Sequence, residues 1–375
     1  MSDVEASVLA VVRNHIGHLT LNRPLSLNAL TLDMVRHLQR HLKAWEHNPE
    51  VVAVVLRASG DRAFCAGGDI RMLYDSYKSG SNQHETFFEE EYALDEYIHS
   101  YSKPIMVLMD GLVFGGGMGL AQGAALRVIT ERTRMGMPEV SIGFFPDVAG
   151  SYFLSRLPGE LGMYLGVSGV QIRAADALYS GLADWCIASS QIAELDHCLN
   201  NMSWASHPQE ALNTLRALLA TLGVDQLPGS ELKAMRPAID EHFAHADLLS
   251  IRAALRSESR PQYQDWAEEA VDVLDSRSPL AMAVTLELLR RGRHLSLSDC
   301  FAQELHLDYQ WFDKGDLMEG IRALIIDKDK SPAWDPPTLA ELDGDRVQAF
   351  FGDFKPTLTA RVPHHKRDAR CTTSN

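Results

Sequence analysis

The stretch PIMVLMDGLVFGGGMGLAQGAALRVIT, residues 104–130, decides the fold class of this chain. Residues 104–109 are apolar throughout, as in a strand that is buried on both faces of a sheet. The triple glycine at 115–117 indicates a turn, the chain from there to about Ala124 fits a helix, and residues 126–130 fit the next strand. This order of strand, helix and strand predicts an α/β fold with parallel strands.

The chain before this stretch shows the same alternation. Two strand-like runs, 8–12 and 18–21, lie on either side of Gly17 and predict a β-hairpin. Apolar residues recur every three or four positions between 31 and 46, which predicts an amphipathic helix. The apolar run 51–56 then predicts a buried strand, so the crossover of strand, helix and strand occurs twice.

The second half of the chain has a different pattern. After residue 148 the periodicity is mostly helical, and a total of 375 residues exceeds what one typical domain holds. We expect a core at 1–200 and a helical region at 201–355 that packs on it. The tail at 356–375 is polar and basic without apolar periodicity, and we expect it to be disordered.

Composition argues against several classes of protein. The chain has 50 acidic and 35 basic residues, and a net charge of −15 disfavours nucleic acid and anionic lipid as partners. No stretch approaches the roughly 20 apolar residues that a membrane span needs. The 5 cysteines form no CxxC pair, which disfavours a disulfide framework and a metal site. The first ten residues include two acids and no basic residue, unlike a signal or transit peptide, so we expect a cytoplasmic protein.

Two glycine-containing segments follow predicted strands, where ligands bind in open α/β sheets. They are AFCAGGD at 63–69 and GLVFGGGMG at 111–119. Neither has the spacing of a P-loop or of a dinucleotide-binding fingerprint, so we expect no nucleotide site of those kinds. Peptide N–H groups from two such loops can form an oxyanion hole, whereas for either loop alone a tight turn explains the glycines equally well.

A third segment, MGMPEVSIGFFPD at 135–147, places Glu139 and Asp147 in apolar surroundings. Ionisation of a carboxyl group is disfavoured there, so such an acid can act as a general acid or base near neutral pH. For a lone acid, a helix cap or an exposed loop position is the more common explanation. Other hydrolytic chemistry has little support, because there is no G-x-S-x-G elbow and the His242 and His245 pair lacks a third metal ligand.

Together these segments resemble the crotonase (enoyl-CoA hydratase/isomerase) superfamily. The resemblance rests on LNRP at 21–24, NAL at 28–30, both glycine segments and MPE at 137–139. GFFPDV at 143–148 and EGIRALIIDKD at 319–329 resemble the 3-hydroxyisobutyryl-CoA hydrolase branch and extend the likeness over nearly the whole chain. The family implies a spiral of ββα repeats with a mostly helical C-terminal region.

The resemblance also implies acyl-CoA thioester substrates, with coenzyme A as part of the substrate and no separate cofactor. It places six residues around that substrate: Ala66, Gly68, Glu91, Gly116, Glu139 and Asp147. The N–H groups of Gly68 and Gly116 would form the oxyanion hole, and the backbone near Ala66 would contact the adenine. Glu139 and Asp147 would be catalytic, and Glu91 would bind the acyl group. Members of the family often form oligomers, which leaves a homo-oligomer possible.

Departures from the family pattern bear on the reaction. Hydratases of the family have a second glutamate two positions after the triple glycine, where this chain has Gly119, and commonly have glycine where it has Asp147. Ala149 stands where many of the hydrolases have glycine. We therefore expect a hydrolase that releases coenzyme A and a short 3-hydroxy acid, 3-hydroxyisobutyrate in valine catabolism. The alternatives are an enoyl-CoA hydratase or isomerase, and a non-catalytic protein that binds coenzyme A.

Overall fold

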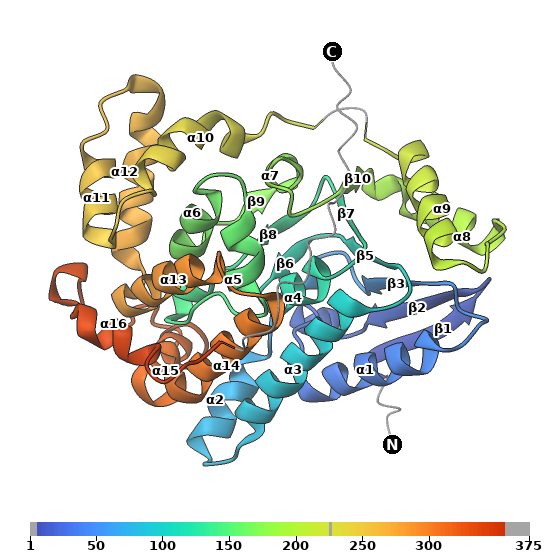
Figure 1. Ribbon diagram of the computed structural model, residues 1–375, viewed down its shortest axis with the longest axis horizontal. Helices are drawn as coiled ribbons and strands as arrows, with labels where there is room; N and C mark the ends of the chain where they lie inside the picture. Colours follow the sequence, from blue (N-terminus) through green and yellow to red (C-terminus); the bar gives the residue numbers. More distant parts are fainter. Residues whose placement is uncertain (1–5, 225–226, 357–375) are drawn as a thin grey trace.

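The computed structural model describes residues 6–224 and 227–356 (Figure 1). Its larger sheet has the strand order β1-β2-β3-β5-β7-β10. The strands are β1 (Val8–Arg13), β2 (Ile16–Leu21), β3 (Ala53–Ala58), β5 (Ile105–Met109), β7 (Leu126–Thr130) and β10 (Trp185–Ile187). The hairpin of β1 and β2 is antiparallel and all other pairs are parallel, as the alternation of strand and helix predicts.

A second, smaller sheet has the order β4-β6-β8-β9. Its strands are β4 (Ala63–Cys65), β6 (Leu112–Phe114), β8 (Arg134–Gly136) and β9 (Ile172–Arg173). Strands β3, β5 and β7 of the larger sheet are each followed by one strand of the smaller sheet and then by helical structure. The chain therefore has the spiral of ββα repeats that the family resemblance implies.

Sequence patterns alone missed the smaller sheet. The segments 63–69 and 111–119 read as loops, whereas each begins with or contains a strand of three residues. A third repeat, formed by β7 and β8, was also missed. Strands this short are less than two alternations long, so they leave no measurable period in the sequence.

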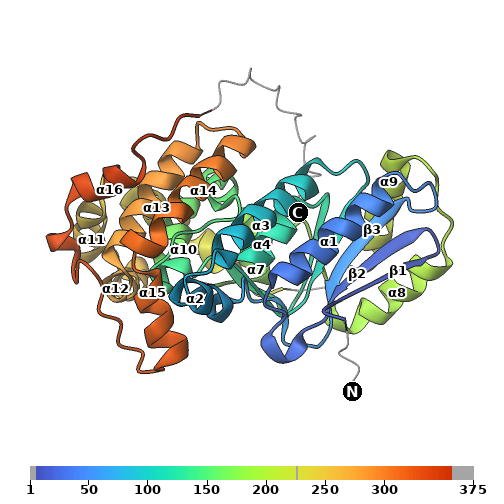
Figure 2. The ribbon, with the colours of Figure 1, turned by 90° about the horizontal axis from the view of Figure 1, so that it is seen from below.

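Helices cover both faces of the larger sheet (Figures 1 and 2). On one face lie α1 (Leu32–Glu46) and α3 (Gln83–Ser100), and α1 buries the apolar stripe that the sequence predicts. Thr31 caps α1, because its hydroxyl accepts the N–H of Met34 at 3.3 Å. On the other face, α8 (Ile192–Asn201) and α9 (Pro208–Thr221) bury leucines against β3, β5 and β7.

Most of the remaining helices gather at the end of the molecule away from β1 (Figure 2). They are α5 (Gly150–Phe153), α6 (Leu161–Ser168), α10 (Glu231–His242), α11 (Leu248–Arg256), α12 (Pro261–Ser276), α13 (Pro279–Gly292), α14 (Leu297–Lys314), α15 (Leu317–Ile321) and α16 (Gly344–Phe350). Helix α7 (Ala174–Ser180) instead contacts β9 and β10. Helix α14 contacts α3 and α5, and α13 contacts α6. The C-terminal region is thus helical and packs on the core; the predicted disordered tail lies outside the described residues from 357 on.

The described residues contain no candidate for a membrane span or a metal site. Within residues 6–224 and 227–356, no helix combines the length and apolar character needed to cross a bilayer. In the same ranges, no three side chains of His, Cys, Asp or Glu come together in a way that could hold a metal ion.

Candidate active site

A cavity of about 710 Å³ lies where β4, β6 and β8 end, beside α3 and α15. The carboxyl ends of parallel strands meet at one edge of a sheet, so the loops that follow them form one wall. All six residues predicted from the sequence line this cavity: Ala66, Gly68, Glu91, Gly116, Glu139 and Asp147. Residues from four separate stretches of sequence are thereby brought together.

The two glycine segments present backbone N–H groups to this cavity. Gly68 forms a parallel bridge with Leu30 in which the hydrogen bonds use the Gly67 carbonyl and the Asp69 N–H. The N–H of Gly68 therefore points to the other side of the strand. Gly116 is the first residue of α4 (Gly116–Gln122), where a helix leaves its N–H groups without carbonyl partners. These are the two donors that the family resemblance assigns to an oxyanion hole.

Glutamates lie closely against the second glycine segment. Gly115 has a φ of +48°, and a Cβ at this position would be 2.8 Å from Oε1 of Glu139. A Cβ on Gly116 would overlap Oε1 of Glu91. The positive φ favours glycine at position 115, and at both positions the bare backbone lets a carboxylate approach this closely.

Three of the acids that line the cavity are buried. Glu91 is 2% exposed, Glu139 7% and Asp147 5%. The hydroxyl of Tyr92 donates a hydrogen bond to Oδ2 of Asp147 at 3.0 Å. Oε1 of Glu91 and Oε2 of Glu139 accept no hydrogen bond from any side chain or backbone group in the described ranges. One oxygen on each glutamate is therefore buried without a hydrogen-bond partner within those ranges.

Burial changes the ionisation of these acids. It raises the pKa of Asp147 to about 7, and the hydrogen bond from Tyr92 opposes this shift. The pKa of Glu139 is raised well above its ordinary value by burial and by the charge of Asp147. The pKa of Glu91 is raised by burial, then by Asp95 and Asp147. Acids this strongly coupled titrate as a group, and near pH 7 they can share protons.

The backbone around Glu139 and Asp147 is unusual. Glu139 begins a short 3₁₀-helix, Glu139–Ile142, which ends at Gly143 with a φ of +72°. The indole N–H of Trp311 on α14 donates to the Gly143 carbonyl at 2.8 Å. After Asp147 both Val148 and Ala149 have positive φ, +50° and +65°. The glycine that many of the hydrolases have at position 149 fits this left-handed conformation, and alanine adopts it here at a cost in strain.

Sequence reasoning missed several acids that surround this site. Asp95 on α3 and Asp308 on α14 are buried. Neither oxygen of Asp95 accepts a hydrogen bond within the described ranges, and Asp308 lies beside the hydroxyl of Tyr92. Glu304, one turn before Asp308, is also fully buried. Asp95 follows Glu91 by four residues and Asp308 follows Glu304 by four, so each pair shares one helix face. The spacing of four residues within each pair was therefore a signal from which these buried acids could have been predicted.

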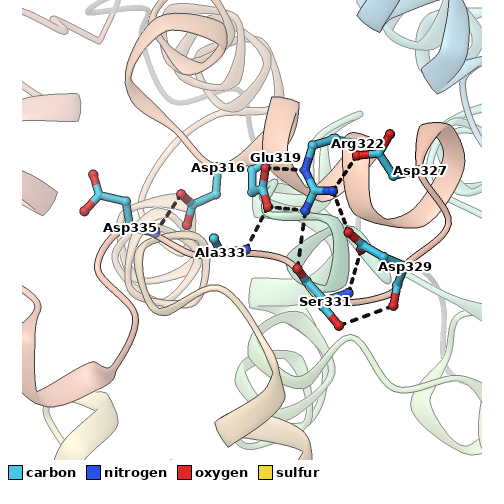
Figure 3. Close-up of polar contacts among 8 residues, drawn as sticks. All are labelled: Asp316, Glu319, Arg322, Asp327, Asp329, Ser331, Ala333 and Asp335. Atoms are coloured by element: carbon cyan, nitrogen blue, oxygen red, sulfur yellow. Dashed lines mark hydrogen bonds and ion pairs between the residues drawn. The ribbon is translucent and has the colours of Figure 1, made fainter.

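The C-terminal region supplies another wall of the cavity. Leu317 on α15 and two residues of the π-helix Arg322–Ile326, Leu324 and Ile325, line it. The guanidinium of Arg322 holds this wall together, with five hydrogen bonds to four nearby residues (Figure 3). It donates two hydrogen bonds to Glu319, at 2.7 and 2.8 Å. Three further bonds go to Asp327, Asp329 and the carbonyl of Ser331, at 2.6, 2.7 and 3.3 Å.

Comparison with known proteins identifies the family. A model described as enoyl-CoA hydratase/isomerase matches residues 16–351, and the chain belongs to this family. Within it, the chain is similar to proteins named 3-hydroxyisobutyryl-CoA hydrolase, mitochondrial. The protein of that name from Gallus gallus is 35% identical over 93% of this chain and 90% of the relative. The one from Danio rerio is 36% identical over 89% of this chain and 86% of the relative.

Two solved structures have the same fold over nearly their whole length. A carnitinyl-CoA dehydratase from Mycobacterium thermoresistibile superposes with a TM-score of 0.84 at 39% identity, covering 95% of this chain and 99% of that one. An enoyl-CoA hydratase from Rhodobacter sphaeroides 2.4.1 superposes with a TM-score of 0.82 at 35% identity. The match covers 92% of this chain and 97% of that one. The likeness includes the C-terminal helical region, which confirms the predicted fold class.

Proposed function

We propose that the chain hydrolyses acyl-CoA thioesters of short 3-hydroxy acids, with 3-hydroxyisobutyryl-CoA of valine catabolism as its substrate. The observation that carries this proposal is the position of Glu139 and Asp147 beside the two glycine segments, with Gly119 in place of a second hydratase glutamate. The names of the relatives, which cover most of the chain, support the same reaction.

The thioester carbonyl would bind with its oxygen at the N–H groups of Gly68 and Gly116. Negative charge develops on that oxygen during attack, and a donor fixed by the backbone stabilises it without reorganising. Loss of one such donor typically costs about 10² to 10³ in rate. The adjoining backbone at Ala66 would hold the coenzyme A portion.

Glu139 would supply the attack on the carbonyl carbon. In one route its carboxylate displaces coenzyme A and forms a mixed anhydride, which water then hydrolyses. In the other it removes a proton from water as the water attacks. Both routes need the ionised form of Glu139, and both yield a free acid and the coenzyme A thiol.

Asp147 and Glu91 would recognise the hydroxyl of the acyl group. A buried carboxyl group that loses its hydrogen-bond partner costs free energy, so a site built around such a partner rejects acyl groups without it. Because burial raises the pKa of Asp147 to about 7, this residue can either accept a hydrogen bond from the hydroxyl or donate one to it near neutral pH.

Thiol release from a panel of esters tests the function. The panel contains 3-hydroxyisobutyryl-CoA, isobutyryl-CoA, which lacks only the hydroxyl, and crotonyl-CoA. We expect rapid thiol release from the hydroxylated ester and much slower release from isobutyryl-CoA. Equal rates for the two esters would contradict the proposed role of the hydroxyl.

The same panel separates the alternatives. The names of the two solved structures favour a hydratase as the second candidate. A hydratase would remove the absorbance of the crotonyl-CoA double bond without releasing thiol. A protein that only binds coenzyme A would release no thiol from any ester and leave crotonyl-CoA unchanged.

Three further features belong to the proposal. We propose that the reaction needs no separate cofactor, that the protein is cytoplasmic, and that it can form homo-oligomers. The names of the animal relatives place those proteins in mitochondria.

A further inference from the structure

The turn after Asp147 has a backbone that needs an external constraint. Val148 and Ala149 are both buried, and both are in the left-handed region at +50° and +65°. For residues with a Cβ this conformation costs on the order of 1 to 2 kcal/mol each. The N–H of Gly150 donates to the carbonyl of Asp147 at 2.6 Å, which closes the turn but leaves the two strained residues unsupported on the outside.

The carboxylate of Glu304 on α14 supplies that constraint. Oε2 accepts the N–H of Ala149 at 2.7 Å, and Oε1 accepts the N–H of Ser151 at 2.9 Å. The hydroxyl of Ser151 donates to the same Oε1. Glu304 is fully buried, so no water competes for these contacts. Three donors from a single turn thus converge on one carboxyl group.

Helix α14 also fixes the partner of the Asp147 side chain. Phe301, one turn before Glu304, packs against the ring of Tyr92 with centroids 5.7 Å apart. Tyr92 in turn donates its hydroxyl to Asp147. One helix of the C-terminal region therefore constrains Asp147 twice, through the backbone that follows it and through its hydrogen-bond donor.

We propose that Glu304 is the positioning residue for Asp147. By holding the amides of Ala149 and Ser151, it fixes the turn that directs the Asp147 carboxylate into the cavity. Glu304 does not line the cavity, so it acts through Asp147 and not on the substrate. Its effect on turnover rests on the proposed function, whereas its hold on the turn does not. The C-terminal region is then part of the catalytic unit and more than a cover for the core.

A matched control exists elsewhere in the fold. Asp176 on α7 holds the start of α10, because its Oδ1 accepts the hydroxyl of Ser230 at 2.6 Å and the N–H of Leu232 at 2.9 Å. Asp176 is buried but lies outside the cavity lining. Asp176→Asn therefore makes the same acid-to-amide exchange at a buried carboxyl group without touching Asp147.

The test compares Glu304→Gln with Asp176→Asn. The amide of glutamine presents a donor to one of the two backbone N–H groups, so the turn loses one contact and gains a repulsion. We expect Glu304→Gln to lower kcat about 10- to 100-fold, as small displacements of catalytic groups do, with KM little changed and the preference for the hydroxylated ester reduced. In Asp176→Asn the amide oxygen can still accept both contacts, so kcat, KM and that preference should equal those of the parent.

A second readout does not depend on the reaction. Hydrogen exchange of the amides at 147–153 should be faster in Glu304→Gln than in the parent, and unchanged there in Asp176→Asn. Ser151→Ala removes the hydroxyl contact but keeps both backbone contacts, so kcat should fall measurably but less than tenfold. If Glu304→Gln does not fold, parental kinetics and parental exchange in Ser151→Ala would overturn the proposal. If the parent releases no thiol, the proposed function fails. Hydrogen exchange at 147–153 then still tests whether Glu304 holds the turn. Parental kinetics and parental exchange in Glu304→Gln would overturn the proposal, as would an equal loss of kcat in Asp176→Asn.

Discussion

The carboxylate of Asp95 lies directly against Gly119, in the space that a side chain at position 119 would need. Asp95 is on α3 and Gly119 on α4, and a Cβ on Gly119 would also be only 2.7 Å from Cβ of Val148. The position at which hydratases of the family have their second glutamate is thus filled from another helix. The packing around Gly119 therefore leaves no space for that glutamate, and a single substitution at position 119 cannot restore it.

Gly119→Ala should therefore be strongly destabilising. The added methyl group overlaps both Asp95 and Val148, and overpacking of a close-packed core typically costs about 1 to 3 kcal/mol in the free energy of unfolding. Removing the Asp95 carboxylate as well, in Gly119→Ala with Asp95→Ala, should recover part of the loss. Chemical denaturation measures the free energy of unfolding of the single and the double variant. Gly344→Ala, where a Cβ meets no atom within 4 Å, is the control and should change stability little. A parental unfolding midpoint for Gly119→Ala would contradict this packing.

Glu139→Gln should nearly abolish thioester hydrolysis. The amide can neither attack the carbonyl carbon nor remove a proton from water, and general base catalysis alone contributes about 10² to 10⁴ in rate. Binding of coenzyme A should persist, since the glycine segments are unchanged. Steady-state thiol release and calorimetric binding of coenzyme A measure the two effects. Glu287→Gln, an acid on α13 outside the cavity, should behave as the parent does. Undiminished turnover in Glu139→Gln would exclude it from catalysis.

Asp147→Asn should make stability less sensitive to pH. The pKa of Asp147 rises from 3.8 to about 7 on folding, so between these values the folded state keeps a proton that the unfolded state has lost. The free energy of unfolding therefore falls as pH rises through this window, by up to about 1.4 kcal/mol per pH unit for one group. Asparagine removes that contribution, so the variant should lose less stability between pH 5 and 7 than the parent.

The control for this titration is an apolar core substitution. Leu219→Ala on α9 should lower the free energy of unfolding by a similar amount at every pH, because no titrating group is removed. Denaturation midpoints at pH 5, 6 and 7 measure all three proteins. Parallel pH profiles for Asp147→Asn and the parent would show that Asp147 is ionised in the folded state throughout this range.

Patterns within single segments predicted much of this molecule. The strands of the larger sheet and α1 have either a continuous apolar run or an apolar stripe of helical period, and the structure confirms them. The strands of the smaller sheet are three residues long or shorter, and they are defined by pairing with one another and not by their own composition. Local periodicity cannot reveal that kind of strand.

The acidic run at 89–91 shows what a single sequence leaves open. Glu89 accepts the hydroxyl of Tyr309 at 2.6 Å, Glu90 pairs with Arg36 at 2.7 Å, and Glu91 lies buried in the cavity. The residue type is the same in all three positions, so only the helical stripe through Phe87 and Phe88 predicts which one is buried. Glu304 is 157 positions from Asp147 in the sequence, and no local pattern connects such residues.

Arg322→Lys should weaken substrate binding more than chemistry. The planar guanidinium bonds Glu319 on one side and Asp327 and Asp329 on the other, whereas an ammonium group cannot reproduce this fork. The cavity wall at Leu324 should then become less ordered, so KM for acyl-CoA should rise several-fold while kcat changes less than twofold. The control is Arg252→Lys, which breaks a comparable fork to Asp275 outside the cavity lining and should leave both constants unchanged. If kcat fell as much as the affinity, the Arg322 network would have to support the reacting groups themselves. If the KM equalled that of the parent, the cavity wall would keep its shape without the hydrogen bonds of the guanidinium.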